Sequence, residues 1–231
     1  MEHVFPPAVI AALPVAGSNA QFPVHRIYCV GRNYVDHAKE MGGTGREAPF
    51  FFMKPADAVL PLLPGVTGTM RYPTHTASLH HEVELVVAIG SGGRDIPAAD
   101  AMAHVWGYAV GIDMTRRDLQ ADAKKLGRPW CVSKGFDESA PIGPVHRIEE
   151  TGAINDARIY LEVNGRMRQE STIDMLIWSI VETIETLSGY FALLPGDLIF
   201  TGTPAGVAAV APGDLLTFGV EGLDRLELRI V

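Results

Sequence analysis

The chain has 231 residues, of which 47% are hydrophobic and 20% charged, a composition typical of a globular protein with one or two domains. Its formal net charge of -8 and its lack of a Lys/Arg cluster argue against nucleic-acid binding. No apolar run reaches the roughly 20 residues that a membrane-spanning helix needs. The N-terminus has no basic segment before its apolar residues, so we expect no signal peptide and a cytoplasmic protein.

Residues 1–25 contain four prolines and are predicted to form an arm laid over a single domain at 26–231. Apolar runs rich in β-branched residues and bounded by glycine or proline predict strands. In the first half these runs are 25–31, 49–55, 82–90 and 105–113. Helical spacing of apolar residues, ended by glycine, predicts helices at 33–41 and 114–126. A short helix is also predicted at 98–105.

The second half is also dominated by strands. Asn164-Gly165 lies between apolar runs at 158–164 and 166–171, a pattern typical of a tight hairpin. The longest predicted helix is 174–188, and three strands separated by Gly/Pro turns follow it. Because strands do not alternate regularly with helices, we expect a β-rich α+β fold with a mixed sheet rather than a parallel doubly wound fold.

Glu82 and Glu84 belong to the run HHEVELVVAIG, in which strand alternation directs both carboxylates to the same face. Adjacent carboxylates on a buried strand repel each other unless a cation binds them, and Asp113, at the end of VWGYAVGID, can supply a third oxygen. Carboxylates without a nearby cysteine favour Mg²⁺ or Mn²⁺. Two alternatives stay open: a solvated pair without a metal, and an Fe²⁺ or Zn²⁺ site that includes His80.

His37 and Glu40 are three residues apart on the predicted helix that Asn33 caps, so their side chains can touch. A histidine oriented by a carboxylate is a suitable general base for activating water. Glycines flank this helix, a pattern compatible with a lid over a substrate. The alternative is an ordinary pair on the surface of a helix.

Lys54 and Lys134 each lie at the end of an apolar, strand-like segment, where lysine is rare without a partner or a task. Lys134 is a candidate for stabilising an enolate, and the alternative is a structural ion pair with Asp137 or a metal-binding carboxylate. The two cysteines, Cys29 and Cys131, are also in apolar strand-like segments, so we expect buried, reduced thiols.

Further candidates for contacts with substrate oxygens come after Asp113 and near the C-terminus. Arg116, Arg117 and Gln120 are on the predicted helix that follows Asp113, where most such residues face water. The loop GTPAGV at 202–207 lacks the spacing and the lysine of a nucleotide-binding loop, but its Thr203 hydroxyl could contact an anion.

Several segments together resemble the fumarylacetoacetate hydrolase family and follow the family's order. They are CVGRNYVDHAKEM (29–41), FFMKPADAV (51–59), HHEVELVVAIG (80–90), GIDMTRRDLQ (111–120), GRPWCVSKGFD (127–137), VNGRMRQ (163–169) and GDLIFTGTPAGV (196–207). The resemblance implies a mixed β-sheet roll, a homodimer and a Mg²⁺ or Mn²⁺ cofactor bound by carboxylates alone. It is greatest to the bacterial fumarylpyruvate hydrolases of gentisate breakdown, through the PFFFMKPADAV segment and the long N-terminal part.

The family's functional residues fall on positions that this sequence occupies with the same residue types. They are the metal ligands Glu82, Glu84 and Asp113, the catalytic residues His37, Glu40 and Lys134, and the pocket residues Gln120 and Thr203. The implied activity is hydrolysis of a C–C bond in a 2,4-dioxo acid, with fumarylpyruvate giving fumarate and pyruvate. Arg32, Lys54 and Arg117 are unranked candidates for the distal carboxylate.

Three other interpretations remain. The family includes acylpyruvases, and it includes oxaloacetate decarboxylases or tautomerases, in which the same metal and lysine would stabilise an enolate. A decarboxylase or tautomerase needs no hydrolytic water, so its activity would not depend on His37. The third interpretation is a small-molecule binder without catalytic activity.

Overall fold

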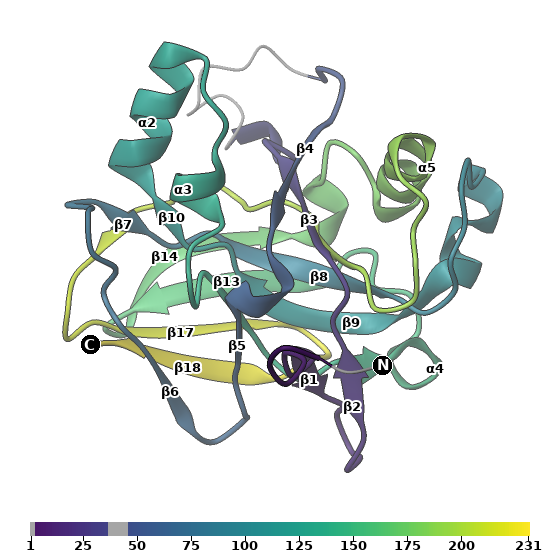
Figure 1. The fold of residues 1–231 in the computed structure, drawn as a ribbon, viewed down its shortest axis with the longest axis horizontal. Coiled ribbons are helices and arrows are strands. Elements are labelled where there is room, and N and C mark those ends of the chain that lie inside the picture. Colours follow the sequence, from purple (N-terminus) through teal and green to yellow (C-terminus); the bar gives the residue numbers. More distant parts are fainter. Residues whose placement is uncertain (1–2, 37–45) are drawn as a thin grey trace.

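The computed structural model describes residues 3–36 and 46–231, which form a curled mixed sheet structure with few helices (Figure 1). The largest sheet has eight strands in the order β4-β3-β15-β8-β9-β11-β5, with β12 paired to β9. These strands are β3 Ile27–Gly31, β4 Phe50–Lys54, β5 Val59–Pro61, β8 Val83–Ile89, β9 Val105–Ile112, β11 Ala140–Ile142, β12 His146–Arg147 and β15 Leu198–Phe200. Antiparallel pairs predominate, and β3–β15 and β5–β11 are parallel.

A second sheet of five strands has the order β14-β13-β17-β18-β6. Its strands are β6 Thr67–Met70, β13 Arg158–Val163, β14 Arg166–Thr172, β17 Leu215–Val220 and β18 Arg225–Ile230. Two small sheets join β1 Ala12–Pro14 to β2 Gln21–Pro23, and β7 Leu79–His80 to β10 Thr115–Arg116 and β16 Ala209–Val210. The expected β-rich α+β fold with a mixed sheet is confirmed.

The helices lie around the sheets. Among the described residues they are α2 Arg117–Leu126, α3 Cys131–Lys134, α4 Ile148–Thr151 and α5 Ile180–Tyr190, with 3₁₀ turns at Ala56–Ala58, Ala98–His104 and Ile173–Met175. Figure 1 shows α2 and α3 together on one side of the molecule and α5 on the other. None of the helices formed by the described residues is long and apolar enough to cross a membrane.

Strand β8 is buried along its whole length, and its two faces contribute to different parts of the core. Val83, Leu85 and Val87 join the larger hydrophobic cluster, which also includes residues of the five-stranded sheet. Val86 and Ala88, on the opposite face, join a smaller cluster with the β1–β2 hairpin. Because side chains alternate along a strand, the second face is the one that carries the two glutamates at the N-terminal end of β8.

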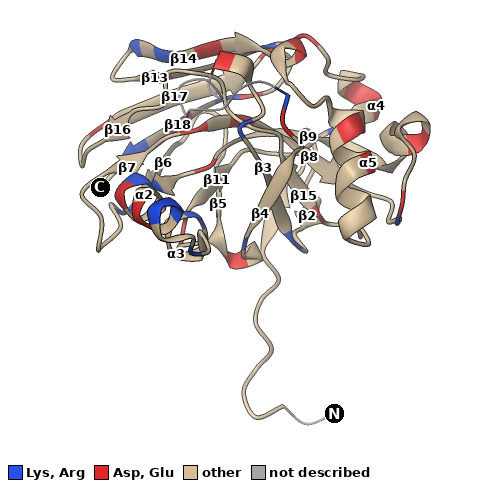
Figure 2. Cartoon of the chain, turned by 90° about the horizontal axis from the view of Figure 1, so that it is seen from above, with Lys and Arg blue, Asp and Glu red and all other residues tan. Residues whose placement is uncertain are grey.

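The N-terminal residues divide into two parts. The β1–β2 hairpin buries Leu13 and Phe22 against the smaller hydrophobic cluster. Val4 and Phe5, by contrast, are 100% and 76% exposed, and Figure 2 shows this segment extending away from the body of the protein.

Most predicted strands are present within one or two residues of their expected bounds. The hairpin turn is confirmed: Asn164 and Gly165 have φ values of 52° and 72°, and β13 and β14 flank them. Positive φ at both central residues is typical of the tight turn that suits the twist of paired strands. The helix predicted over 114–126 begins later, at Arg117, and ends at Gly127, which adopts the left-handed conformation.

The helix predicted over 174–188 is wrong at its start. A 3₁₀ turn at Ile173–Met175 is followed by an extended stretch, and α5 begins only at Ile180. The reason is local hydrogen bonding. Asn33 accepts from the Trp178 N–H at 2.7 Å and donates to the Trp178 carbonyl at 2.9 Å, so it holds this residue outside a helix.

The short helix predicted over 98–105 is present as a 3₁₀ helix at Ala98–His104. One further prediction needs correction. The segment around Cys131 is not a strand but the short helix α3, which places this thiol in the exposed class while Cys29 is buried in β3 as expected. Both thiols are free.

Candidate metal centre and active site

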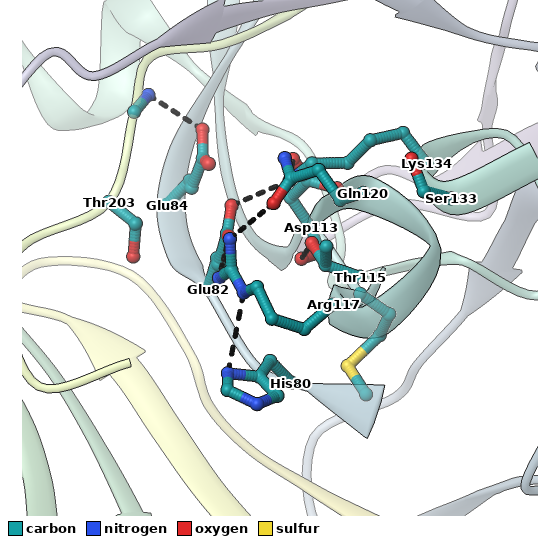
Figure 3. Close-up of polar contacts among 12 residues, drawn as sticks. His80, Glu82, Glu84, Asp113, Thr115, Arg117, Gln120, Ser133, Lys134 and Thr203 are labelled. Carbon is teal, nitrogen blue, oxygen red and sulfur yellow. Dashed lines mark hydrogen bonds and ion pairs between the residues drawn. The ribbon is translucent and has the colours of Figure 1, made fainter. Parts of the chain in front are cut away.

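Three carboxylates meet at the N-terminal end of β8. Glu82 directly precedes this strand, Glu84 is its second residue, and Asp113 follows the neighbouring strand β9. The Asp113 N–H donates to the Glu82 carbonyl at 2.8 Å, which holds the two chain segments side by side. All three side chains are buried, and one carboxylate oxygen from each lies within 4.8 Å of the other two (Figure 3). We call these residues the carboxylate triad.

The Glu84 carboxylate is buried beside two like charges. Burial, and then the charges of Asp113 and Glu82, raise the pKa of Glu84 well above its usual value. The Gly202 N–H, which donates to Glu84 Oε2 at 2.6 Å, acts in the opposite direction. Among the described residues, no lysine or arginine forms an ion pair with Glu84, whereas the other two carboxylates have such partners. A divalent cation bound by the triad would remove this repulsion.

The donor set fits a hard cation, because it consists of carboxylate oxygens without cysteine or histidine. His80 is directed elsewhere: its Nε2 lies 3.0 Å from Ser78 Oγ, and its Nδ1 faces Arg117 Nε at 3.5 Å. In Figure 3 its ring lies beyond Arg117, away from Glu84. The geometry therefore favours the carboxylate-only site over the alternative that included His80.

Two buried lysines bracket Asp113. Lys134, in α3, places Nζ 2.6 Å from Asp113 Oδ2 and 2.7 Å from Glu82 Oε2. Lys54, at the end of β4, places Nζ 2.7 Å from Asp113 Oδ1 and donates to the carbonyls of Lys134 and Met114. Burial lowers the pKa of Lys134, but the charges of Asp113 and Glu82 outweigh it and raise the pKa above its ordinary value. Both lysines are therefore ion-pair partners of the triad.

Arg117, the first residue of α2, contributes the third cation. Its guanidinium forms an ion pair with Glu82 Oε1 and donates to Gln120 Oε1 at 2.6 Å. Gln120 is one helical turn further along and is 3% exposed. The three cations Lys54, Lys134 and Arg117 thus balance the three negative charges of the triad.

Thr203 is held by a buried hydrogen-bond network. Its Oγ1 donates to the Val83 carbonyl at 2.8 Å and accepts from Gln169 Nε2 at 2.8 Å. Gln169 is oriented in turn, because its Oε1 accepts from the Val83 N–H at 3.2 Å and lies 2.8 Å from His81 Nδ1. Since the hydroxyl hydrogen is used by Val83, Thr203 has an acceptor lone pair left for a ligand.

A pocket opens over Glu82 and Glu84 of the triad. The described residues that line it come from five parts of the chain: Val30, Gly31 and Arg32; Phe50 and Phe52; Glu82 and Glu84; Arg117, Gln120, Trp130 and Lys134; and Thr203. Seven candidates from the sequence are therefore in the pocket wall: Arg32, Glu82, Glu84, Arg117, Gln120, Lys134 and Thr203. Lys54 is behind the triad and not in this wall.

His37 and Glu40, the predicted water-activating pair, lie outside the described residues.

The sequence did not indicate the aromatic side of the pocket. We call Phe50, Phe52 and Trp130 the aromatic wall. The centre of the Trp130 ring lies 5.5 Å from the centre of each phenylalanine ring. The two phenylalanines belong to a strand that the sequence predicted, but alternation alone does not tell which face meets a pocket. The Gly202 N–H that binds Glu84 was also missed, because backbone donors leave no trace in residue types.

Comparison with known proteins gives a consistent result. Residues 26–231 match the sequence profile of the fumarylacetoacetate hydrolase C-terminal family. The crystal structure of a fumarylpyruvate hydrolase from Pseudomonas aeruginosa, in complex with Mn²⁺ and pyruvate, has 53% sequence identity and a TM-score of 0.98, covering 100% of this chain and 99% of its own. A mitochondrial oxaloacetate decarboxylase from Dictyostelium discoideum is 41% identical over 86% of this chain and 90% of its own length. A mitochondrial oxaloacetate tautomerase from Rattus norvegicus is also 41% identical, over 88% of this chain and 90% of its own length.

The Mn²⁺ of the Pseudomonas aeruginosa enzyme agrees with the donor set of the triad, and the cofactor is a divalent cation, Mg²⁺ or Mn²⁺. The profile match covers most of the chain, and the relatives match nearly all of it. The chain belongs to the fumarylacetoacetate hydrolase family.

Proposed function

We propose that this protein hydrolyses the C–C bond of a 2,4-dioxo acid, with fumarylpyruvate as its preferred substrate and fumarate and pyruvate as products. The observation that carries the proposal is the full-length likeness to a fumarylpyruvate hydrolase with Mn²⁺ and pyruvate, combined with a pocket that is lined by Lys134 and by Glu82 and Glu84 of the carboxylate triad. This activity would place the protein in the breakdown of aromatic compounds through gentisate.

Glu82, Glu84 and Asp113 are proposed to hold the cation, which when bound supplies positive charge to the carboxylate and 2-oxo oxygens of the substrate. The difficult step is expulsion of pyruvate as an enolate, because the electron pair of the broken C3–C4 bond moves onto the leaving group. Lys134 presents a fixed positive charge beside the triad, where that negative charge develops. Arg117 and Gln120, already joined to each other, are proposed to orient substrate oxygens.

The charge balance of the site supports a substrate with two carboxylates. Lys54, Lys134 and Arg117 cancel the charge of the triad, so a bound divalent cation and Arg32 of the pocket wall leave three positive charges at the site. A dianionic substrate offsets two of them, whereas a substrate with one carboxylate offsets only one, and charges buried without partners are costly.

His37 and Glu40 are proposed to activate the attacking water, on the basis of the sequence alone. Acting as a unit, they should show strong non-additivity: His37→Ala, Glu40→Ala and the double variant should lose similar amounts of kcat/KM. The measurement is steady-state hydrolysis of fumarylpyruvate. Additive losses would mean that the two residues do separate jobs.

Oxaloacetate decarboxylation or tautomerisation is a second candidate, favoured by the two relatives at 41% identity. The same cation and Lys134 would stabilise the enolate that forms when CO₂ leaves or a proton moves. This chemistry needs no hydrolytic water, so it should survive the loss of His37.

The decisive experiment compares three substrates with one Mn²⁺-loaded preparation: fumarylpyruvate, acetylpyruvate and oxaloacetate. Loss of the enol absorbance and quantification of pyruvate report cleavage, and CO₂ release reports decarboxylation. We expect the highest kcat/KM for fumarylpyruvate, and its loss in Lys134→Met. Faster turnover of oxaloacetate, independent of His37, would replace the proposal by the second candidate.

We further propose that the protein is a cytoplasmic homodimer that acts on small molecules and has no nucleic-acid or membrane partner. The negative net charge supports the absence of nucleic-acid partners, and exposed apolar residues near β4, considered in the Discussion, support the dimer.

A further inference from the structure

Arg32 is a cation in the pocket wall that forms no ion pair with a carboxylate of the described residues. It follows β3 with φ of 55°, in the left-handed region that non-glycine residues rarely adopt. Its Nε is buried without a hydrogen-bond partner, and no ion pair joins Arg32 to a carboxylate in the described part of the chain. Strained backbone and an unused buried donor commonly occur where a residue is kept for a ligand.

The other two candidates for a distal carboxylate are already engaged. Lys54 contacts Asp113 and two backbone carbonyls, and it does not line the pocket. Arg117 is joined to Glu82 and to Gln120. A substrate carboxylate would have to compete for either side chain with a partner that the fold already supplies.

Strand β4 shows where Arg32 lies relative to the triad. Phe50, Phe52 and Lys54 alternate onto the same face, with about 13 Å of strand between the first and the last. The Arg32 guanidinium lies 5.9 Å from the centre of the Phe50 ring, at one end of this row. At the other end Lys54 contacts Asp113, and in between Lys134 Nζ lies 5.0 Å from the Phe52 ring. Arg32 is therefore at the end of the row that lies away from the triad.

The aromatic wall runs between these two ends, because Trp130 contacts both phenylalanine rings. Gly31 allows Phe50 to lie in this row: a Cβ on Gly31 would be only 2.1 Å from the Phe50 ring. Phe50 itself is 37% exposed, so this end of the wall is at the mouth of the pocket. A flat, conjugated chain is the shape that stacks best along such a surface.

Arg32 and Arg117 both act on Lys124, a third cation on the neighbouring helix α2. Burial, followed by the charges of Arg32 and Arg117, lowers the pKa of Lys124. An anion bound beside Arg32 would reduce this repulsion between like charges.

From this placement we propose that Arg32 is the specificity-determining residue that binds the carboxylate at the acyl end of the substrate, while the aromatic wall packs against a flat, unsaturated acyl chain. The inference rests on the proposed function for the identity of the reaction. It also applies to any ligand whose second carboxylate reaches the mouth, so it can be tested without turnover.

The kinetic test compares Arg32→Gln with the wild-type holoenzyme on fumarylpyruvate and on acetylpyruvate, which lacks the second carboxylate. We expect kcat/KM for fumarylpyruvate to fall about ten- to a hundredfold, the range for a hydrogen bond to a charged group, and kcat/KM for acetylpyruvate to change less than about twofold. Arg32→Lys should recover part of the loss, because it keeps the charge but not the planar fork. Arg128→Gln, at an exposed residue of the same charge, is the matched control.

The binding test uses calorimetric titration of the Mn²⁺-loaded protein, saturated with pyruvate, with fumarate and with crotonate, in which a methyl group replaces one carboxylate. Wild type should prefer fumarate, and Arg32→Gln should abolish the preference by weakening fumarate alone. Trp130→Leu should weaken both ligands. Equal losses for both ligands in Arg32→Gln, or no preference in wild type, would overturn the inference. Failure of wild type to hydrolyse fumarylpyruvate would overturn only the proposed reaction.

Discussion

At the scale of single residues, the placement of Glu84 predicts opposite effects of one substitution on stability and on metal binding. Its carboxylate is buried next to Asp113 and Glu82, which together with burial raise its pKa. A raised carboxyl pKa destabilises the metal-free fold at every pH above the unfolded value, because the charged form is disfavoured there. Removing that charge without changing the shape of the side chain should therefore stabilise the metal-free protein. The same substitution should weaken metal binding, because the cation loses a charged ligand.

We therefore expect Glu84→Gln to melt at the same temperature as wild type, or higher, in chelator at pH 7. Its affinity for Mn²⁺ should fall at least about tenfold, because a charged ligand is lost. Thermal unfolding and calorimetric metal titration measure the two effects on the same samples. Glu150→Gln, at an exposed glutamate of α4, is the matched control. Unchanged Mn²⁺ affinity in Glu84→Gln would contradict a metal site at the triad.

The grouping of the three carboxylates of the triad could be predicted from the sequence because it depends on a short-range rule. Alternation along β8 puts Glu82 and Glu84 on one face, and β9, the strand that pairs with β8, ends at Asp113. The aromatic wall depends instead on a contact between β4 and the residue before α3, far apart in sequence. Nothing in the local pattern around Trp130 indicates which phenylalanines it meets.

At the scale of elements, α5 shows why apolar periodicity alone misplaces a helix. Met175, Ile177 and Trp178 continue the helical spacing, yet the helix begins after Ser179. Ser179 and Glu182 form a capping box: the Glu182 N–H donates to Ser179 Oγ at 3.4 Å, and Glu182 Oε2 accepts from the Ser179 N–H at 3.0 Å. The pattern Ser-x-x-Glu was a visible start signal that outweighs the periodicity before it.

Loss of this cap should cost measurable stability. Ser179→Ala is expected to destabilise the protein by about 1 kcal/mol, which lowers Tm by about 2–4 °C in a chain of this size. The Ser179 hydroxyl and N–H, and then Arg46, lower the pKa of Glu182, so its stabilising charge is present above the unfolded pKa and is lost as the pH falls. The difference in unfolding free energy between Ser179→Ala and wild type should therefore become smaller at acidic pH. Ser91→Ala, at an exposed serine, is the control, and a pH-independent difference would contradict the role of the Glu182 charge.

At the scale of the whole molecule, the sequence predicts the class of fold but not how its sheets close. Strand positions follow from local runs, whereas the order β4-β3-β15-β8-β9-β11-β5 joins strands that are far apart in the chain. The parallel pairing of β15 with β3 brings the Thr203 loop close to Gly31 and Arg32 in one pocket. Long-range pairings of this kind are decided by packing of the complete core, which no local pattern reports.

The proposed homodimer has a physical reason on the outer side of β4. Met53 and Val132 are 40% and 62% exposed, and an apolar hollow lies between β4 and the start of α3. Exposed apolar surface of this kind favours association. We expect sedimentation velocity to show a dimer, and Val132→Glu to weaken it roughly tenfold or more. Val66→Glu, at a similarly exposed valine, should leave the dimer intact, and a monomeric wild type would contradict the proposal.

Binding of the cation should stabilise the entire domain, because the triad joins β8 to the end of β9 at the centre of the largest sheet. A ligand that binds only the folded state adds about 2.7 kcal/mol at a hundredfold excess over its Kd. For a chain of this length that corresponds to a rise in Tm of about 5–11 °C. Scanning calorimetry with Mn²⁺, with chelator, and with K⁺ at matched ionic strength measures the rise and separates it from charge screening. Because the stabilisation comes from the triad, Glu84→Gln should lose most of it, and an equal rise in that variant would mean that the cation binds elsewhere.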